Sequence, residues 1–255
     1  MRAAVPGADL YYEVAGDGPP LLSVSGSGSA LRFGIGPATS PLRKDLTVVG
    51  YDHRGVGESV DLSSEPPTMD VFARDALALA DRLGWDRFAL HGLSFGGMVA
   101  QHVAALAPDR VTALSLACTS AGGAGGASYP LHEIGSPFAE RMTELIDTRT
   151  AEDAELREFF LAFLSAGDPA ALGEGYQRQM AARKEHDAWD RLPLITAPTL
   201  VGSGRYDAIA PPANGAALAG RIPGAEHRVY EGGHAYLFQD PAAASDLRDF
   251  LLEPR

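Results

Sequence analysis

The 255-residue sequence has one cysteine and two lysines, and it lacks any long hydrophobic run. Cys118 alone cannot form an internal disulfide, which excludes a disulfide framework and a zinc site built on cysteines. No apolar run approaches the roughly 20 residues of a membrane-spanning helix. The segment Met1–Gly18 contains acidic side chains where a signal peptide has its apolar region. We therefore expect a soluble, cytoplasmic protein.

Basic residues are also scarce, since 21 Lys and Arg stand against 33 Asp and Glu, giving a net charge of −12. A chain of this charge repels phosphate backbones and anionic lipid headgroups, so we expect neither nucleic acid nor a membrane as partner. Hydrophobic residues make up 45% and charged residues 21%, which is typical of globular proteins and argues against a disordered or fibrous chain.

Short apolar segments with strand character alternate with segments of helical period. Between the first two strands, apolar residues recur every three or four positions from Met69 to Leu83, which predicts an amphipathic helix. This alternation predicts an α/β fold with a mainly parallel sheet covered by helices on both faces. The clearest strands are Leu46–Tyr51, Phe88–His91, Val111–Ala117, Thr199–Gly202 and His227–Tyr230.

The N-terminal region differs from this pattern. Asp9–Val14 and Leu21–Val24 are separated by a turn rich in glycine and proline, which predicts an antiparallel hairpin at the sheet edge.

Residues 120–192 interrupt the alternation. They begin with the glycine-rich run Gly122–Gly126 and continue with helical patterns but no convincing strand. We therefore predict a helical cap at 120–192, inserted into a core formed by residues 1–119 and 193–255. The cap should cover the substrate pocket as a lid, and its candidate pocket residues are Tyr129, His132, Phe159 and Phe163.

The pattern Gly92-x-Ser94-x-Gly96 lies where a predicted strand ends and a helix begins, the context of a nucleophile elbow. Glycines are needed because the turn is tight and a Cβ would collide with neighbouring elements. The turn places the Ser94 hydroxyl at a helix N-terminus, where the Phe95 N–H can stabilise an oxyanion. The alternative is a glycine-rich turn with an ordinary surface serine.

A serine nucleophile needs a base and an acid that orients it, which follow the serine in the order acid, then histidine. His234 comes after the last predicted strand, and Asp207 comes just after the strand that begins at Thr199. All three side chains should meet at the carboxyl edge of the sheet, where ligands of α/β proteins bind. Taken singly, Asp207 is also compatible with a turn cap and His234 with a surface-loop histidine.

Two further glycine-rich loops follow strands. Ser25–Ser29 should supply the second oxyanion donor; it lacks the third glycine of a dinucleotide-binding loop and the Gly-Lys-Ser/Thr of a P-loop. In Asp52–Ser59 we expect a structural role, with Asp52 and Arg54 bracing the turn and its glycines at positive φ. His227, Glu231 and His234 have no metal-binding spacing, so we expect no metal.

Together these motifs resemble those of the α/β-hydrolase superfamily. The run Gly92–Met98 is most similar to the branch of 3-oxoadipate enol-lactonases, antibiotic methylesterases and cofactor-free haloperoxidase-like esterases. The resemblance covers the chain apart from the insertion. It implies an α/β-hydrolase fold with a mostly parallel eight-stranded sheet.

The resemblance also implies the site residues. Ser94, Asp207 and His234 would be the catalytic triad, and the backbone N–H groups of Ser27 and Phe95 would form the oxyanion hole. One departure is that members of this branch usually carry His-Gly where this chain has Ser25-Gly26, so the bracing of that loop stays open.

The sequence thus predicts a serine hydrolase that cleaves a small carboxylic ester or lactone through an acyl-enzyme, without a cofactor. The same triad also serves perhydrolases and carbon–carbon bond hydrolases. The latter usually hold a substrate carboxylate with a basic residue, and no arginine adjoins Ser94 in the sequence. A non-catalytic small-molecule receptor on the same fold is a further alternative, and the oligomeric state is left open.

Overall fold

One sheet organises the computed structural model, which describes residues 1–33, 36–134, 137–165 and 173–253. The strands follow the spatial order β1-β2-β4-β3-β6-β7-β8-β9, with β5 beside β2. Neighbouring pairs from β4 through to β9 in this order are parallel, and the pairs that β2 makes are antiparallel. The strand bounds are β1 (Arg2–Val5), β2 (Ala8–Ala15), β3 (Pro20–Val24), β4 (Thr47–Tyr51), β5 (Val60–Asp61), β6 (Phe88–Leu93), β7 (Val111–Ala117), β8 (Thr199–Gly204) and β9 (Glu226–Tyr230).

The mostly parallel, eight-stranded sheet is confirmed, and the two-residue β5 adds a ninth, short strand within the described residues. The predicted N-terminal hairpin is wrong in its partners. β4 lies between β2 and β3, antiparallel to the first and parallel to the second. The hairpin that does form joins β1 to β2 through Gly7, whose φ of 74° suits glycine. Strand pairing here is decided by β4, which lies far along the chain.

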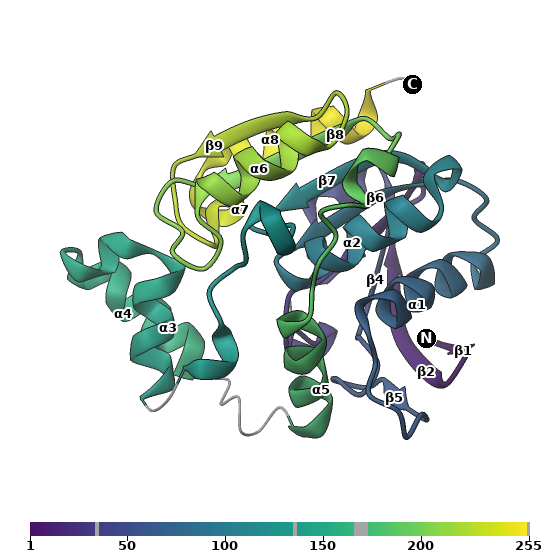
Figure 1. Ribbon diagram of the computed structural model, residues 1–255, viewed down its shortest axis with the longest axis horizontal. Helices are drawn as coiled ribbons and strands as arrows, with labels where there is room; N and C mark the ends of the chain where they lie inside the picture. Colours follow the sequence, from purple (N-terminus) through teal and green to yellow (C-terminus); the bar gives the residue numbers. More distant parts are fainter. Residues whose placement is uncertain (34–35, 135–136, 166–172, 254–255) are drawn as a thin grey trace.

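Helices cover both faces of the sheet (Figure 1). The predicted helix from Met69 to Leu83 is confirmed as α1, and Gly84 follows it at a φ of 71°. Within the described residues no helix is long and apolar enough to cross a membrane. The helix bounds are α1 (Met69–Arg82), α2 (Phe95–Leu106), α3 (Phe138–Ile146), α4 (Ala154–Ser165), α5 (Gly173–Lys184), α6 (Pro212–Arg221), α7 (Tyr236–Gln239) and α8 (Pro241–Leu252).

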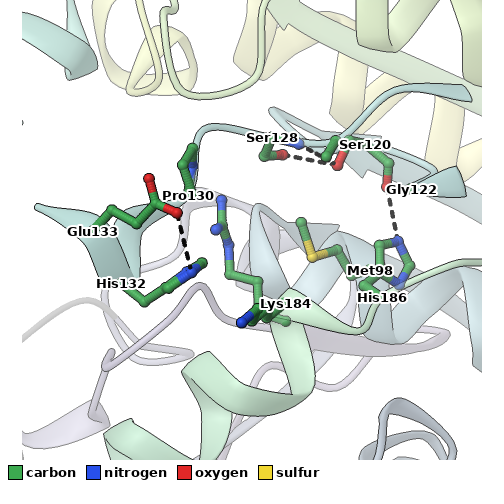
Figure 2. A pocket seen from close by; sticks show the side chains of 11 residues that line it. Met98, Ser120, Gly122, Ser128, Pro130, His132, Glu133, Lys184 and His186 are labelled. Atoms are coloured by element: carbon green, nitrogen blue, oxygen red, sulfur yellow. Dashed lines mark hydrogen bonds and ion pairs between the residues drawn. The ribbon is translucent and has the colours of Figure 1, made fainter.

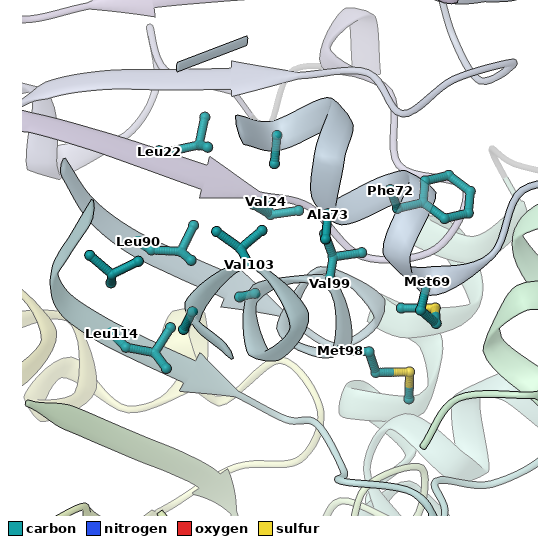
Figure 3. Packing of buried hydrophobic residues seen from close by; sticks show 14 of the residues in the cluster. Leu22, Val24, Met69, Phe72, Ala73, Leu90, Met98, Val99, Val103 and Leu114 are labelled. Carbon is teal, nitrogen blue, oxygen red and sulfur yellow. The ribbon is translucent and has the colours of Figure 1, made fainter. Parts of the chain in front are cut away.

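Each face of the sheet has its own apolar core. Leu21 and Leu22 are neighbours in β3 but belong to different cores, because successive strand side chains point to opposite faces. Leu22 packs with residues of α1, α2 and α6, and Leu21 packs with residues of α8. Figure 3 shows Leu90 and Leu114 of neighbouring strands beside Val103 of α2. This packing fixes where β6 ends and α2 begins.

The chain between β7 and β8 forms α3, α4 and α5, which lie toward one edge of the sheet (Figure 1). These helices share a small apolar cluster, which includes Phe160, Tyr176 and Met180 and also Ile209 from the loop after β8. Residues 135–136 and 166–172 of the predicted cap lie outside the described residues. The helical content matches the sequence pattern of this segment.

Candidate active site

Ser94 occupies a strained turn between β6 and α2. Its φ is 55°, a conformation that is costly for a residue with a side chain and that recurs at functional sites. A Cβ at Gly92 would overlap the carbonyl oxygen of Gly96, and a Cβ at Gly96 would overlap that of Val24. The Ser94 N–H donates to the Ala117 carbonyl at 2.8 Å, which ties the turn to β7. The local geometry is that of a nucleophile elbow.

Asp207 and His234 form a direct pair. Asp207 Oδ2 lies 2.8 Å from His234 Nδ1, and its other oxygen accepts the N–H groups of Ile209 and Ala210 at 2.8 and 2.9 Å. Since a carboxylate only accepts, Nδ1 must carry the proton and donate it. In the neutral ring Nε2 is then unprotonated and able to take a proton, as a general base requires.

The three predicted residues lie at the same edge of the sheet, following β6, β8 and β9. Cys118 is close to both Ser94 and His234. It follows Ala117, whose carbonyl accepts the hydrogen bond of the Ser94 N–H, and its Sγ lies 4.0 Å from the carbonyl oxygen of Gly233, which precedes His234. Among the hydrogen bonds of the described residues, none joins the Ser94 hydroxyl to His234. Such bonds are often loose in the absence of substrate and tighten when it binds.

Cys118 is a residue that the sequence reasoning did not place at this site. Its Sγ, an oxygen of Asp207 and a ring nitrogen of His234 all lie within 4.8 Å of one another, a spacing that also suits a metal ion. Burial, with the Asp207 carboxylate beside it, raises the pKa of the Cys118 thiol. The metal-free thiol is therefore neutral at physiological pH, and a metal ion would have to displace its proton on binding.

The predicted oxyanion loop, Ser25–Ser29, packs against the elbow. A Cβ at Gly26 would lie only 3.5 Å from the Ser94 Cβ. The Gly28 N–H donates to Gln179 Oε1 of α5 at 2.9 Å, and the Ser29 N–H donates to the Gly26 carbonyl at 3.3 Å. The loop thus lies directly beside Ser94, and Phe95 lies on the other side of the serine as the first residue of α2.

His53 supplies bracing that the sequence left open for this loop. Its Nε2 lies 3.1 Å from the Ser25 carbonyl. Burial lowers the pKa of His53 to about 4, so the ring is neutral and Nε2 donates. Its ring lies edge-on to those of Tyr51, Phe72 and Phe95. No local pattern in the sequence marks His53 or Gln179 for this role, because both act across long sequence separations.

The Asp52–Ser59 loop has the structural role expected for it. The two oxygens of Asp52 accept the N–H groups of Leu31 and Glu58, at 2.7 and 2.8 Å. Arg54 is buried and pairs with Asp75 at 2.6 Å. Gly55 and Gly57 have φ of 71° and 59°. Asp52 thereby ties this loop to the segment that follows the oxyanion loop.

The structure contains a pocket of about 220 Å³, and Figure 2 shows the side chains that line it. Ser94, Asp207 and His234 do not line this pocket, but two of the lining residues are connected to Ser94 by hydrogen bonds, one directly and one through its neighbour in the chain. Met98 N–H donates to the Ser94 carbonyl at 3.2 Å, and Ser120 follows Thr119, whose hydroxyl donates to that carbonyl at 2.9 Å. The lining residues are Met98, Ser120, Gly122, Ala127, Ser128, Pro130, His132, Glu133, Arg183, Lys184 and His186.

Of the predicted pocket residues, the structure brings His132 to this lining. Tyr129 lies between two lining residues but is itself half-exposed and outside the lining. Phe159 and Phe163 are not part of the pocket, and their exposed fractions of 63% and 58% correct the prediction. The helical period of α4 gives the reason: Phe160 packs into the apolar cluster of these helices together with Leu156 and Leu164, whereas Phe159 and Phe163, four residues apart, share the outer face.

Comparison with known proteins agrees with this geometry. Residues 26–134 match the family model described as alpha/beta hydrolase fold. The chain is 30% identical over 243 residues to the poly(3-hydroxyalkanoate) depolymerase of Ectopseudomonas oleovorans, covering 92% of this chain and 85% of that protein. It is 29% identical over 254 residues to the RutD protein of Caulobacter sp. (strain K31), provisionally named a carbamate hydrolase, covering 92% of each.

A solved structure is similar to this chain over almost its whole length. The enol-lactonase from Burkholderia xenovorans LB400 has a TM-score of 0.77 and 27% identity, covering 99% of this chain and 100% of that one. The elbow, the sheet order and these similarities lead to one conclusion: this chain belongs to the α/β-hydrolase superfamily.

Proposed function

We propose that this hydrolase cleaves a carboxylic ester or a lactone of a small organic molecule through an acyl-enzyme on Ser94. The observation that carries the proposal is the 2.8 Å hydrogen bond between Asp207 and His234, at the sheet edge where the elbow presents Ser94. A carboxylate whose other oxygen is held by two backbone N–H groups is fixed in place and can orient the ring.

The reaction follows from this arrangement. Nε2 of His234 takes the proton of the Ser94 hydroxyl as Oγ attacks the carbonyl carbon, while Asp207 stabilises the imidazolium. The N–H groups of Ser27 and Phe95 bind the negative oxygen of the tetrahedral intermediate. His234 gives its proton to the departing alcohol, and a water molecule then releases the acid with His234 again acting as base.

The relatives support an acyl carbon as the point of attack. Their names assign lactones, polyesters and carbamates as substrates, including an N-acyl homoserine lactone degrading enzyme with 27% identity and a TM-score of 0.77. All of these compounds contain a carbonyl bonded to a leaving oxygen or nitrogen. The chain's own residues favour this chemistry because the elbow and the acid–base pair act on any such carbonyl.

We also propose that residues 120–192 act as a cap over a core of residues 1–119 and 193–255. The cap forms hydrogen bonds both to the oxyanion loop and to His234. From α5, Gln179 accepts the N–H of Gly28 in the oxyanion loop. At the end of α3, the carbonyl of Ile146 accepts the His234 N–H at 2.6 Å. Through these contacts, the position of the cap and the geometry of the site are linked.

The test uses a panel of p-nitrophenyl esters and simple lactones with the wild-type protein and Ser94→Ala. We expect turnover by the wild type, loss of turnover in the folded variant, and one fluorophosphonate label at Ser94 by mass spectrometry. Labelling at another serine, or full activity of Ser94→Ala, would contradict the proposal. Binding of the panel without turnover would favour a receptor, and peracid formation exceeding hydrolysis when hydrogen peroxide is added would favour a perhydrolase.

A further inference from the structure

Among the described residues, one buried cation has no counter-charge. Arg183 lies in the last turn of α5, is only 7% exposed and lines the pocket beside Ser94. Its Nε and Nη2 atoms have no hydrogen-bond partner, and no ion pair of the described residues includes it. Leaving a buried guanidinium unpaired is costly, so such a group indicates a missing anion.

The guanidinium remains charged under the conditions in which the protein works. Burial lowers the pKa of Arg183 to about 10, which is still far above neutral pH. Arg54 is also buried, but its guanidinium is paired with two carboxylates, those of Asp75 and Asp61, at 2.6 and 3.2 Å. Arg183 therefore differs in lacking an acid, although both side chains are removed from solvent.

The pocket wall around Arg183 suits an anion. Lys184 adds a second cation, and Ser120 and Ser128 bring hydroxyl groups that lie 2.8 Å apart. Glu133 is the acidic residue of the lining, and its Oε1 faces its neighbour His132 at 3.7 Å, as Figure 2 shows. A single carboxylate balances the charge of Arg183, and its two oxygens match the planar fork of a guanidinium.

The position of Arg183 relates this pocket to the reacting serine. Gln179 lies one helical turn before Arg183 on α5 and holds the oxyanion loop through Gly28. Met98, another residue of the lining, lies one turn after Ser94 on α2. A molecule with one end at Ser94 can therefore extend its other end toward Arg183.

We propose that Arg183 binds a carboxylate carried by the substrate, so that the enzyme prefers esters or lactones that are also carboxylates. This inference rests on the proposed function, since it names the substrate class of the same site. Arg183 neither attacks nor transfers a proton; it anchors the distal end of the substrate while the carbonyl lies at Ser94.

The experiment compares matched ester pairs. The p-nitrophenyl monoester of glutaric acid is paired with p-nitrophenyl 5-methylhexanoate, in which an isopropyl group replaces the carboxylate. A second pair, 4-acetoxybutanoate and 4-methylpentyl acetate, places the charge on the alcohol side. Values of kcat/KM are measured for wild type, Arg183→Met and Arg183→Lys, and Ser94→Ala supplies the uncatalysed background.

We expect wild type to prefer the charged member of at least one pair. Arg183→Met should lose roughly 10–100-fold on that member and less than about threefold on its neutral partner, the range for hydrogen bonds to a charged group. Arg183→Lys should fall between them, because it keeps the charge but not the fork. Arg157→Met, which removes a half-exposed cation of α4 that pairs with Glu144 outside the pocket, serves as the matched control and should change neither ratio.

Further outcomes separate this inference from the function itself. Equal losses on both members of each pair, or no preference in wild type, would overturn the role of Arg183 and leave the hydrolase function intact. If no ester is cleaved, the proposed function fails, and calorimetry with glutarate still tests the anion site. Wild type should bind glutarate at least about tenfold more tightly than Arg183→Met; equal binding by a variant with unchanged Tm would overturn it.

Discussion

Replacing Asp207 by asparagine is the sharpest test of the proposed mechanism, because the structure dictates how the amide must sit. Oδ1 of Asp207 accepts two backbone N–H groups, from Ile209 and Ala210. The amide oxygen of Asn must keep this position, since turning the amide would face its N–H groups against two N–H donors, at a cost of about 1–3 kcal/mol for each donor left unpaired. The amide NH2 is then directed at His234 Nδ1.

The consequence is a change of histidine tautomer. A donor facing Nδ1 requires that nitrogen to accept, so the proton moves to Nε2 and the base toward Ser94 is lost. We expect kcat for p-nitrophenyl acetate to fall by roughly 10³–10⁴-fold, while KM changes little. The thermal midpoint should stay close to that of wild type, because the shape and the two backbone hydrogen bonds are kept.

Asp240→Asn is the matched control. Asp240 also accepts two backbone N–H groups, from Ala242 and Glu231, but no histidine faces it. Asn at this position can accept only one of the two N–H groups, so the variant should lose about 1–3 kcal/mol of stability, but the kcat of the folded protein should change by less than about threefold. If Asp207→Asn keeps more than a tenth of wild-type kcat, or if Asp240→Asn loses as much, the assignment of the acid is wrong.

Four further predictions concern the loops, the buried histidines and metal dependence. Gly96→Ala should destabilise the protein by more than about 2 kcal/mol in urea titrations, because the new Cβ overlaps the carbonyl oxygen at the end of β3; an unchanged midpoint would contradict the elbow geometry. Gln179→Leu removes the acceptor of the Gly28 N–H, so kcat should fall roughly tenfold with KM nearly constant; a change confined to KM would argue against a link to the oxyanion loop. Burial lowers the pKa of His53 and His91 from 6.5 to about 4, so the unfolded chain binds protons first and stability is lost as pH falls from 6.5 to 4, by roughly 3 kcal/mol for each ring. Urea midpoints at pH 7 and 4.5 should show this loss, and His91→Gln should reduce it. Activity should survive dialysis against EDTA, and a loss restored by Zn²⁺ would show that a metal takes part.

Local sequence determined the strands, the helices and the elbow. Met69 to Leu83 were predicted as a helix because their apolar period matches 3.6 residues per turn; of the five residues on that face, Met69, Phe72, Ala76 and Leu79 are buried, and Leu83 packs partly buried against the same core. Gly92 and Gly96 mark the elbow because their backbone positions leave no space for a Cβ. Such features depend on neighbours in the chain, so a pattern in the sequence suffices to predict them.

Tertiary structure decided everything that joins distant segments. β4 separates β2 from β3, which no turn signal between them could reveal. His53 and Gln179 hold the oxyanion loop from 28 and 151 residues away. Phe159, Phe160 and Phe163 are the same residue type in one predicted helix, yet only Phe160 is buried when α4 packs on its neighbours.

The same distinction applies to charge. No arginine adjoins Ser94 in the sequence, but the fold places Arg183 in the pocket beside it, without a counter-ion. The sequence alone was enough to predict the residues that would attack a carbonyl, because the order of serine, acid and histidine can be read along the chain. The environment of Arg183 was decided by how α5 packs on the core, since burial and pairing arise only when the chain is folded.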